Sequence, residues 1–324
     1  MLRILRIIAA LVLFLGITLY FVDVARFLPT CLDSLLAQRF HDWTCLLVDD
    51  GSDDGSSNIC RDYAGRDVRF VVRRIETRGA YAARNVGLSW ADGDAVYFCD
   101  SDDILHPELL ARLASALESS GADFSYVDAV EFYEEGVPEF RAPPAKLEIV
   151  DVAFPLFARQ KCGLALWHCL FRRQALAGLS FAEDIRRGAD RLFVYEFLRR
   201  SPKMARIDAA LYGYRQRKGS IAHAALGERA VSGYAEVMRR LAADYAKDSR
   251  LAALRRGEFV FMAKYIVREC ERELQSPHLP RCREIVAGLL ADGVLRLRDF
   301  GLKWGWRVFR FARRPCGRSS AART

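Results

Sequence analysis

Short apolar runs alternate with amphipathic segments through the first third of the chain. The runs have the length and side-chain content of buried strands, and they cover residues 16–22, 44–48, 68–73 and 95–99. The segments between them have helical periodicity, and they cover residues 29–38, 56–64 and 80–91. One apolar face of the first of these helices is formed by Leu28, Leu32, Leu35 and Leu36.

Strands that alternate with helices predict an α/β fold with a doubly wound, mainly parallel sheet. In such sheets ligands bind outside the carboxyl ends of the strands. From residue 225 onward the pattern becomes helical and predicts a C-terminal helical extension. The sequence thus predicts where a ligand site would lie before any motif is considered.

Acidic residues cluster directly after two of the predicted strands. Asp49 and Asp50 follow residues 44–48, and Asp100, Ser101 and Asp102 follow residues 95–99. Neighbouring anions repel each other, but Mg²⁺ and Mn²⁺ favour oxygen ligands and are often held by one or two carboxylates together with substrate phosphates. We therefore expect Asp100 and Asp102 to hold a divalent cation that carries a diphosphate.

A plainer explanation of the second acidic cluster is helix capping. Asp102 or Asp103 is suited to cap a helix that begins near Pro107. In the first cluster, Gly51 and Gly55 permit tight turns before the helix over residues 56–64. Both explanations stay open at this point.

Several segments, in this order and spacing, resemble the nucleotide-sugar-binding half of family 2 glycosyltransferases, which have the GT-A fold. They are VDDGSDDGS (48–56), RGAYAARNVGL (78–88) and FCDSDDILHPE (98–108). Three further segments resemble acceptor-side parts of the same family, and they are LWHCLFRR (166–173), RRGADRLF (186–193) and YGYRQRKGSIAH (212–223). The resemblance covers residues 16–223, about two thirds of the chain.

The resemblance implies an inverting, metal-dependent hexosyltransferase whose donor is a nucleotide-diphospho sugar, most simply a UDP-sugar. It implies a glycan or lipid-linked acceptor in cell-surface polysaccharide synthesis. The residues that it assigns to the nucleotide are Asp49, Asp50, Arg84, Asp100 and Ser101. Asp100 and Asp102 would form the DxD metal motif for Mn²⁺ or Mg²⁺, with His223 as a further candidate ligand. From the residues alone, Arg84 is equally an ion-pair partner for the acids, and His223 a structural histidine.

The resemblance also implies a general base. Gly188, Ala189 and Asp190 stand where the family usually has Gly-Glu-Asp, so Asp190 aligns with the base, while Ala189 departs from the pattern. A carboxylate near the acceptor hydroxyl can take its proton as the sugar is transferred. Glu183 and Asp184 are rival bases, and an acid at the start of a helix is favoured in any case by the helix dipole.

Two further residues are candidates for contacts with the acceptor or the diphosphate. Trp167 is able to stack on a sugar, although a core tryptophan is an equal alternative. Arg215, with Arg217 and Lys218, is expected on a loop that covers the diphosphate, and a solvated basic loop is the alternative.

The N-terminal apolar run admits two explanations. Residues 4–22 approach the length of a single membrane span. In the family pattern, however, residues 16–22 form the first strand of the sheet, with Tyr20 in place of the usual proline and Asp23 in place of the usual asparagine. We favour the strand. The resulting organisation is a leader over 1–15, a catalytic domain over 16–223 (halves about 16–137 and 145–223), a helical extension over 224–294 and a tail over 295–324.

Composition indicates the cellular compartment of the protein and a second candidate binding surface. Nine cysteines without paired metal-ligand spacing favour a reducing cytosol. The whole net charge of +8 lies within residues 296–324, where nine Lys or Arg side chains face one acid. These basic residues interleave with aromatic ones such as Trp304, Trp306, Phe309 and Phe311, which favours an anionic membrane surface over nucleic acid. A helix that packs its aromatic side chains on the protein body is the alternative.

The sequence therefore predicts a cytoplasmic enzyme that binds peripherally to the inner face of the cell membrane. Two rival functions remain. A nucleotidyltransferase would need a Gly-rich, basic loop after the first strand, which residues 24–28 lack. A degenerate, non-enzymatic membrane-associated relative is suggested by Tyr20, Asp23 and Ala189, and is opposed by the intact acidic motifs.

Overall fold

A computed structural model describes most of the 324-residue chain. The described residues are 13–76, 79–144, 146–150, 165–200, 203–217, 227–247, 249–272 and 276–313. They form two compact units, the first within residues 1–154, 164–183 and 193–218, and the second within 155–163, 184–192 and 219–324. The predicted ligand His223 lies outside the described residues.

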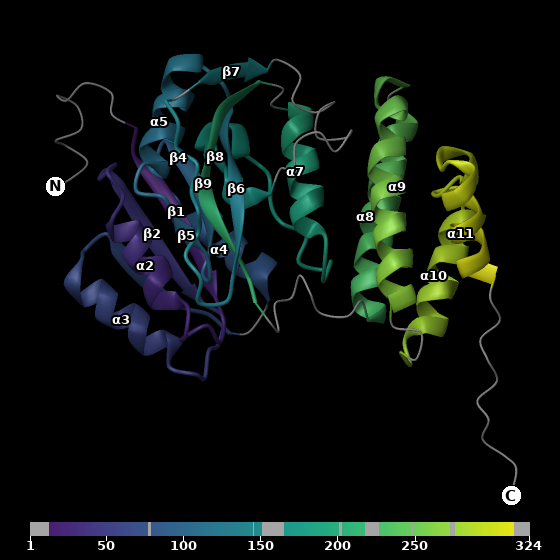
Figure 1. The fold of residues 1–324 in the computed structure, drawn as a ribbon, viewed down its shortest axis with the longest axis horizontal. Helices are drawn as coiled ribbons and strands as arrows, with labels where there is room; N and C mark the ends of the chain where they lie inside the picture. Colours follow the sequence, from purple (N-terminus) through teal and green to yellow (C-terminus); the bar gives the residue numbers. More distant parts are fainter. Residues whose placement is uncertain are drawn as a thin grey trace, which may run out of the picture. The chain divides into compact units, whose positions relative to one another are not determined.

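The first unit is built on one mixed sheet with strand order β3-β2-β1-β4-β8-β6-β9-β5, and β7 pairs with β9 (Figure 1). Its first four strands are β1 (Leu15–Phe21), β2 (Trp43–Asp49), β3 (Phe70–Arg74) and β4 (Ala95–Asp100). All three pairings among them are parallel, as the alternation of strands and helices predicts. From β1 the chain continues to β2 and β3 on one side, and it then returns to place β4 on the other side of β1. The order of the strands therefore reverses between β1 and β4, and the carboxyl ends of these two strands form the switch point of the sheet.

The later strands introduce antiparallel pairing. They are β5 (Ile104–Leu105), β6 (Phe124–Tyr133), β7 (Leu147–Val150), β8 (Cys169–Arg172) and β9 (Met204–Gln216). The β4–β8, β6–β8, β5–β9 and β7–β9 pairs are antiparallel, while β6 and β9 are parallel. Strands from both predicted halves of the catalytic domain thus share one sheet.

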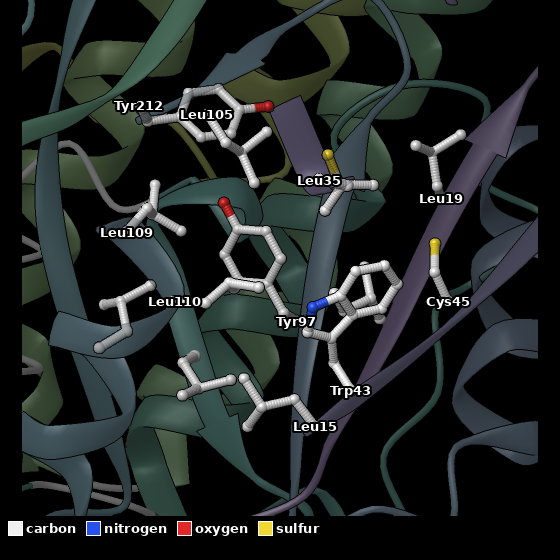
Figure 2. Close-up of a cluster of buried hydrophobic side chains, with 14 of the residues drawn as sticks. Leu15, Leu19, Leu35, Trp43, Cys45, Tyr97, Leu105, Leu109, Leu110 and Tyr212 are labelled. Carbon is white, nitrogen blue, oxygen red and sulfur yellow. The ribbon is translucent and has the colours of Figure 1, made fainter. Parts of the chain in front are cut away.

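One face of the sheet packs against α2 (Leu28–Leu36), α3 (Ser56–Arg66) and α5 (Leu109–Ser120). Alternate β1 side chains, Leu15, Ile17, Leu19 and Phe21, are fully buried in this core. Figure 2 shows Trp43, Tyr97 and Leu110 in the same cluster. The period of two along β1 therefore sends its odd-numbered residues to this layer.

The opposite face of the sheet is covered by α4 (Ala80–Trp90) and by the C-terminal part of α7 (Ala189–Arg200). Phe193 of α7 lies edge-on to Phe98 of β4, with ring centroids 6.2 Å apart. Helix α4 approaches β1 closely because Gly87 has no side chain. Layers of helices on both faces bury most side chains of the central strands.

Substituting Gly87 with Ala is expected to lower the free energy of unfolding by about 1–3 kcal/mol, the usual cost of overpacking a core. A Cβ at Gly87 would stand 2.0 Å from Cγ2 of Thr18 on β1, too close without a shift of helix or strand. Chemical denaturation followed by circular dichroism measures the change. Gly65→Ala is the matched control, because a Cβ at Gly65 in α3 would have no neighbour within 4 Å and should gain up to ~1 kcal/mol of helix stability. Equal stability of Gly87→Ala and the native chain would contradict this packing.

The second unit contains the helices α8 (Glu228–Lys247), α9 (Ser249–Arg272), α10 (Leu279–Ala291) and α11 (Leu302–Arg313). The apolar face of α9 is buried at Ala263, Ile266 and Val267. Pro280 lies in the first turn of α10, where a missing N–H costs no hydrogen bond. These helices confirm the predicted C-terminal helical region.

The N-terminal run shows which of its two explanations holds. Leu15–Phe21 is strand β1, paired on both sides within the sheet, so these residues are part of the sheet and not of a membrane span. Within the described ranges, no helix has the length and apolarity that a bilayer crossing requires.

Candidate functional site

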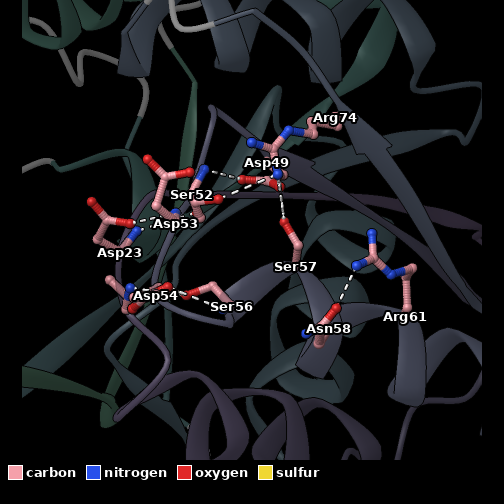
Figure 3. Close-up of polar contacts among 11 residues, drawn as sticks. Asp23, Asp49, Ser52, Asp53, Asp54, Ser56, Ser57, Asn58, Arg61 and Arg74 are labelled. Atoms are coloured by element: carbon pink, nitrogen blue, oxygen red, sulfur yellow. Dashed lines mark hydrogen bonds and ion pairs between the residues drawn. The ribbon is translucent and has the colours of Figure 1, made fainter.

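The loop after β2 is organised around the Asp49 carboxylate (Figure 3). The backbone N–H of Ser52 donates to Asp49 at 2.8 Å, and the Ser57 hydroxyl in the first turn of α3 donates to it as well. Arg74, at the end of β3, lies 3.3 Å from the same carboxylate. Burial alone would raise the pKa of Asp49, but the hydrogen bonds from Ser57 and Ser52, with Arg74, hold that pKa below its usual range. Asp49 therefore shapes the loop as a buried anion.

A second set of contacts joins the loop after β1 to the loop after β2. The Asp23 carboxylate accepts from the N–H of Asp53 at 3.0 Å, and the N–H of Asp23 donates to the Ser52 hydroxyl at 3.2 Å (Figure 3). Asp23 has a φ of 47°, a left-handed conformation that Asp tolerates better than most residues. The departure from the family's asparagine therefore keeps a short polar side chain that ties these two loops together.

Asp50 links the same loop to the start of α4. Its carboxylate accepts from the N–H of Gly79, the residue before α4, at 3.0 Å, and its side chain is almost fully buried. An anion at this position is favoured by the positive end of the helix dipole. The next turns of α4 carry Arg84, so Asp50 and Arg84 are positioned by the same helix.

Two carboxylates at the end of β4 each meet an arginine. Arg84 lies 2.9 Å from Asp100, and Arg217, just after β9, lies 2.6 Å from Asp102. The side chains of Asp100 and Asp102 keep exposed fractions of 30% and 20%, while Ser101 between them is buried. The two acids are thus screened from each other by cations, and both remain open to solvent.

The third acid of the cluster has a different place. The Asp103 carboxylate is fully buried, accepts from the Tyr212 hydroxyl at 2.5 Å, and accepts from the backbone N–H of Arg215 at 2.7 Å. Burial, with repulsion from Asp102 and Asp100, raises the pKa of Asp103 well above its usual value. Because α5 begins only at Leu109, the expectation that Asp103 caps this helix is wrong.

Arg215 lies within β9 rather than on a loop, which corrects its predicted position. It is 3% exposed, and its guanidinium donates to the carbonyl of Asp102 at 2.6 Å and to the carbonyl of Glu134. It also lies over the rings of Phe27 and Phe132, at 4.9 and 4.5 Å from the centroids. In this conformation Arg215 supports the backbone that presents Asp102.

Trp167 belongs to an aromatic stack with Tyr212 and Tyr214 of β9. Its ring lies 4.4 Å from Tyr212 and 5.1 Å from Tyr214, nearly parallel to both. Its neighbour His168 is buried and bonded to the carbonyl of Val127, and burial lowers the pKa of His168 to about 4. His168 also stacks on the Trp167 ring, with centroids 3.8 Å apart, so this partly buried ring packs among three aromatic side chains.

Asp190 is exposed in the first turn of α7 and belongs to the second unit. The preceding Gly188 has a φ of 96°, and Tyr234 of α8 would stand 3.1 Å from a Cβ at that position. A glycine is therefore required on both counts. Of the rival bases, Glu183 accepts from the Asn85 side chain at 2.9 Å, and Asp184 pairs with Arg240 of α8.

The first unit therefore brings together Asp50, Arg84, Asp100 and Asp102 at the carboxyl ends of neighbouring strands. Within the described part of the chain, no group of three or more His, Cys, Asp or Glu side chains is arranged to hold a metal. Two accessible carboxylates fit a hard cation that keeps phosphate oxygens among its ligands. Such a site is suited to a phosphorylated substrate.

Comparison with known proteins agrees with this geometry. The model of the family described as Glycosyl transferase family 2 matches residues 17–177. Residues 17–177 are a glycosyl transferase family 2 domain. The family match includes most of β1, both acidic strand ends and Trp167.

Among curated relatives, the uncharacterized glycosyltransferase EpsJ of Bacillus subtilis is 31% identical over 209 residues, which is 61% of this chain and 60% of that protein. Glycosyltransferase GlyA of Streptococcus pneumoniae is 29% identical over 210 residues and is matched over 30% of its length. The chain thus spans less than two thirds of either relative. TarS of S. aureus, solved with UDP-GlcNAc, has the same fold, with a TM-score of 0.70, 21% identity and coverage of 88% of this chain and 82% of that one.

Several features of this candidate site have no counterpart in the sequence predictions. They are the Ser57 and Arg74 contacts to Asp49, the burial of Asp103 beneath Tyr212, and the pairing of Arg217 with Asp102. Of these residues, Arg74 was the easiest to predict as part of the site from the sequence, because it ends strand β3 at the same edge of the sheet as the acids. The Tyr212 and Arg217 contacts join residues more than a hundred positions apart, so no local pattern contains them.

Proposed function

We propose that this protein transfers a sugar from a nucleotide-diphospho sugar, most simply a UDP-sugar, with the help of a divalent cation. The observation that carries the proposal is the pair Asp100 and Asp102, two residues apart at the switch point of the sheet and both accessible. In α/β sheets this is the edge where nucleotides bind. The UDP-GlcNAc complex of TarS, a protein of the same fold, supports the donor class.

The carboxylates of Asp100 and Asp102 would hold Mn²⁺ or Mg²⁺. When bound, such an ion neutralises the diphosphate and stabilises it as a leaving group. Arg84 and Arg217 already lie against these acids, so their positive charge stands where the diphosphate would enter. When the diphosphate binds, each guanidinium would exchange its carboxylate partner for a phosphate oxygen, so its positive charge would remain paired with an anion.

The nucleoside would be held by the loop after β2 and the start of α4. The buried Asp50 is suited to accept from a base N–H, with Arg84 as a nearby donor and Ser101 beside them. Asp49 would act by positioning this loop, since Ser52, Ser57 and Arg74 already engage its carboxylate. Rigid support of this kind improves the precision of binding groups.

Asp190 would take the proton of the acceptor hydroxyl. Its exposed carboxylate at the start of α7 is accessible to a bulky acceptor. As the hydroxyl oxygen attacks the anomeric carbon from the face opposite the leaving diphosphate, the configuration at that carbon inverts. The partly exposed Trp167 would contact the acceptor sugar with the part of its ring that its aromatic neighbours leave uncovered.

The names of the curated relatives bear on the acceptor. They include glycosyltransferases of PGL/p-HBAD biosynthesis in Mycobacterium bovis, 35% identical over 111 residues. We propose a glycan or lipid-linked acceptor in cell-surface polysaccharide synthesis, with the protein at the cytoplasmic face of the membrane.

The proposed function is tested by incubating purified protein with a panel of nucleotide sugars, with and without Mn²⁺. Release of the nucleoside diphosphate, accelerated by Mn²⁺, is the expected result. Release of pyrophosphate from a nucleoside triphosphate and a sugar phosphate would instead identify a nucleotidyltransferase. Tight nucleotide binding without turnover on any acceptor would identify a non-enzymatic relative.

The C-terminal helix α11 bears on membrane binding. Its inner face is part of the second unit, where Val308 and Phe311 are buried. Leu302 and Trp306, in contrast, are 97% and 62% exposed. The basic residues of the same helix with exposed side chains are Lys303, Arg310 and Arg313. Apolar and basic side chains exposed together suit a membrane that carries anionic lipid.

Replacing Leu302 and Trp306 together with Ser should weaken binding to anionic vesicles by roughly tenfold or more, because both side chains would lose apolar burial in the lipid. A flotation assay with phosphatidylglycerol vesicles measures this. Truncation after Val294 is unsuitable, since it would remove the buried Phe300, Val308 and Phe311. Val137→Ser, at an 82% exposed site in the first unit, is the control and should leave vesicle binding unchanged. Undiminished flotation of the double variant would refute the role of α11.

A further inference from the structure

We propose that Tyr20 is a donor-binding residue whose hydroxyl donates a hydrogen bond to the nucleoside part of the donor. The inference rests on the proposed function and adds to it a residue at the position where the family pattern has a proline. A proline has no side-chain donor, so the contact would be particular to chains that carry tyrosine here.

The direction of the Tyr20 side chain follows from its strand. Along β1, a Cβ at Gly16 would lie 3.1 Å from Ala91, and Thr18 faces Gly87 of α4. Side chains on a strand alternate between faces, so Tyr20 points to the same α4 side of the sheet. Each step of two residues along β1 thus moves its contact about one turn back along α4, from Ala91 to Gly87. The next step places Tyr20 beside the first turns of α4, where Ala83 packs in the same cluster.

The neighbouring strands place Tyr20 between the two acidic clusters. Tyr20 is the register partner of Asp100 on β4 and of Val48 on β2. Adjacent parallel strands direct register partners to the same face, so the phenol and the Asp100 carboxylate lie on one side of the sheet. The ring is half-buried against Val48 and Ala83, and this apolar contact holds it in place.

The hydroxyl group of Tyr20 stands in an acidic surrounding. Burial raises the pKa of Tyr20 to about 12, with further contributions from Asp50 and Asp100 that outweigh the opposing effect of Arg84. A phenol, with an ordinary pKa of about 10, is protonated at neutral pH and can donate. Among the described residues, no hydrogen bond joins this hydroxyl to another protein group.

A hydrogen-bond donor in this position is better suited to bind the nucleoside than to bind the diphosphate. Asp50, on one side, is the acid suited to a base N–H, and Asp100, on the other, belongs to the proposed metal pair. Strand β1 lies between the strands that carry them, so Tyr20 stands between the ends of a bound nucleotide. A neutral phenol adds no charge for a phosphate, but it complements the carbonyl and hydroxyl oxygens of a uridine.

Tyr20→Phe removes the hydroxyl and keeps the ring. Titration calorimetry with UDP and Mn²⁺ should show roughly three- to tenfold weaker binding, the value of one net hydrogen bond. The KM for the donor should rise by the same factor with kcat nearly unchanged, and binding of inorganic pyrophosphate should not change. Tyr133→Phe, at a 70% exposed tyrosine of β6, is the matched control and should bind UDP like the native protein.

Equal UDP affinity of Tyr20→Phe and the native protein would overturn the inference while leaving the proposed function intact. Equal losses for UDP and pyrophosphate would also overturn it, because they would indicate a general disturbance of the site. A native protein that binds no nucleoside diphosphate would instead refute the proposed function itself. A thermal unfolding curve of Tyr20→Phe that matches the native curve excludes loss of fold as the cause of weaker binding.

Discussion

Replacing Asp102 with Asn is expected to abolish metal-dependent sugar transfer, with a loss of about 10²–10³-fold or more, the cost of removing one electrostatic stabiliser from an active site. The substitution deletes one of two accessible carboxylates and leaves Arg217 without its anionic partner. Affinity for UDP in the presence of Mn²⁺ should fall as well. Steady-state kinetics and calorimetry with and without excess EDTA measure both effects.

Asp128→Asn is a matched control for this experiment. Asp128 also pairs with an arginine, Arg206 at 3.2 Å, but it lies on β6, away from the end of β4. Its substitution should leave the metal dependence of transfer unchanged. Full activity of Asp102→Asn, or full activity of the native enzyme in excess EDTA, would show that these carboxylates hold no essential cation.

The second large effect is expected at Asp190. Asp190→Asn should lower kcat by about 10²–10⁴-fold, the usual contribution of a general base, because the amide cannot take the acceptor proton. The affinity for the donor nucleotide should change little, since the base serves the acceptor. Single-turnover kinetics with saturating donor separate the two quantities.

The rival acids provide the comparison. Glu183→Gln keeps a group able to accept from Asn85, and Asp184→Asn removes one of the two carboxylates that pair with Arg240, so both variants should retain most of the native kcat. Circular dichroism of all three variants confirms that each is folded. Near-native turnover of Asp190→Asn together with an inactive Glu183 or Asp184 variant would place the base upstream.

The first hundred residues show how much of the fold follows from local sequence. Helix α3 begins at Ser56 as predicted, and β4 covers the predicted run with one further residue, Asp100. Parallel strands buried on both faces produce continuous apolar runs, which local patterns reveal well. The antiparallel pairing of β8 between β4 and β6 was not predicted, because it depends on contacts between distant segments.

The candidate site divides in the same way. The acidic strand ends are local, so residue order alone led to Asp49, Asp50, Asp100 and Asp102. Their individual environments are not local. Asp49 is held by Ser57 and Arg74, and Asp103 is buried under Tyr212, so carboxylates that look equivalent in the sequence differ in access and pKa.

The sequence by itself determined the alternation of elements, the family and the edge of the sheet where the acids gather, since each follows from short-range periodicity and motif order. Only the tertiary structure decided that residues 15–21 form a central strand and that Arg215 is a buried support. It also decided that Tyr20 faces α4 beside Asp100. The physical reason is that strand register, burial and charge pairing are set by residues brought together across the whole fold, and no single segment of the chain encodes them.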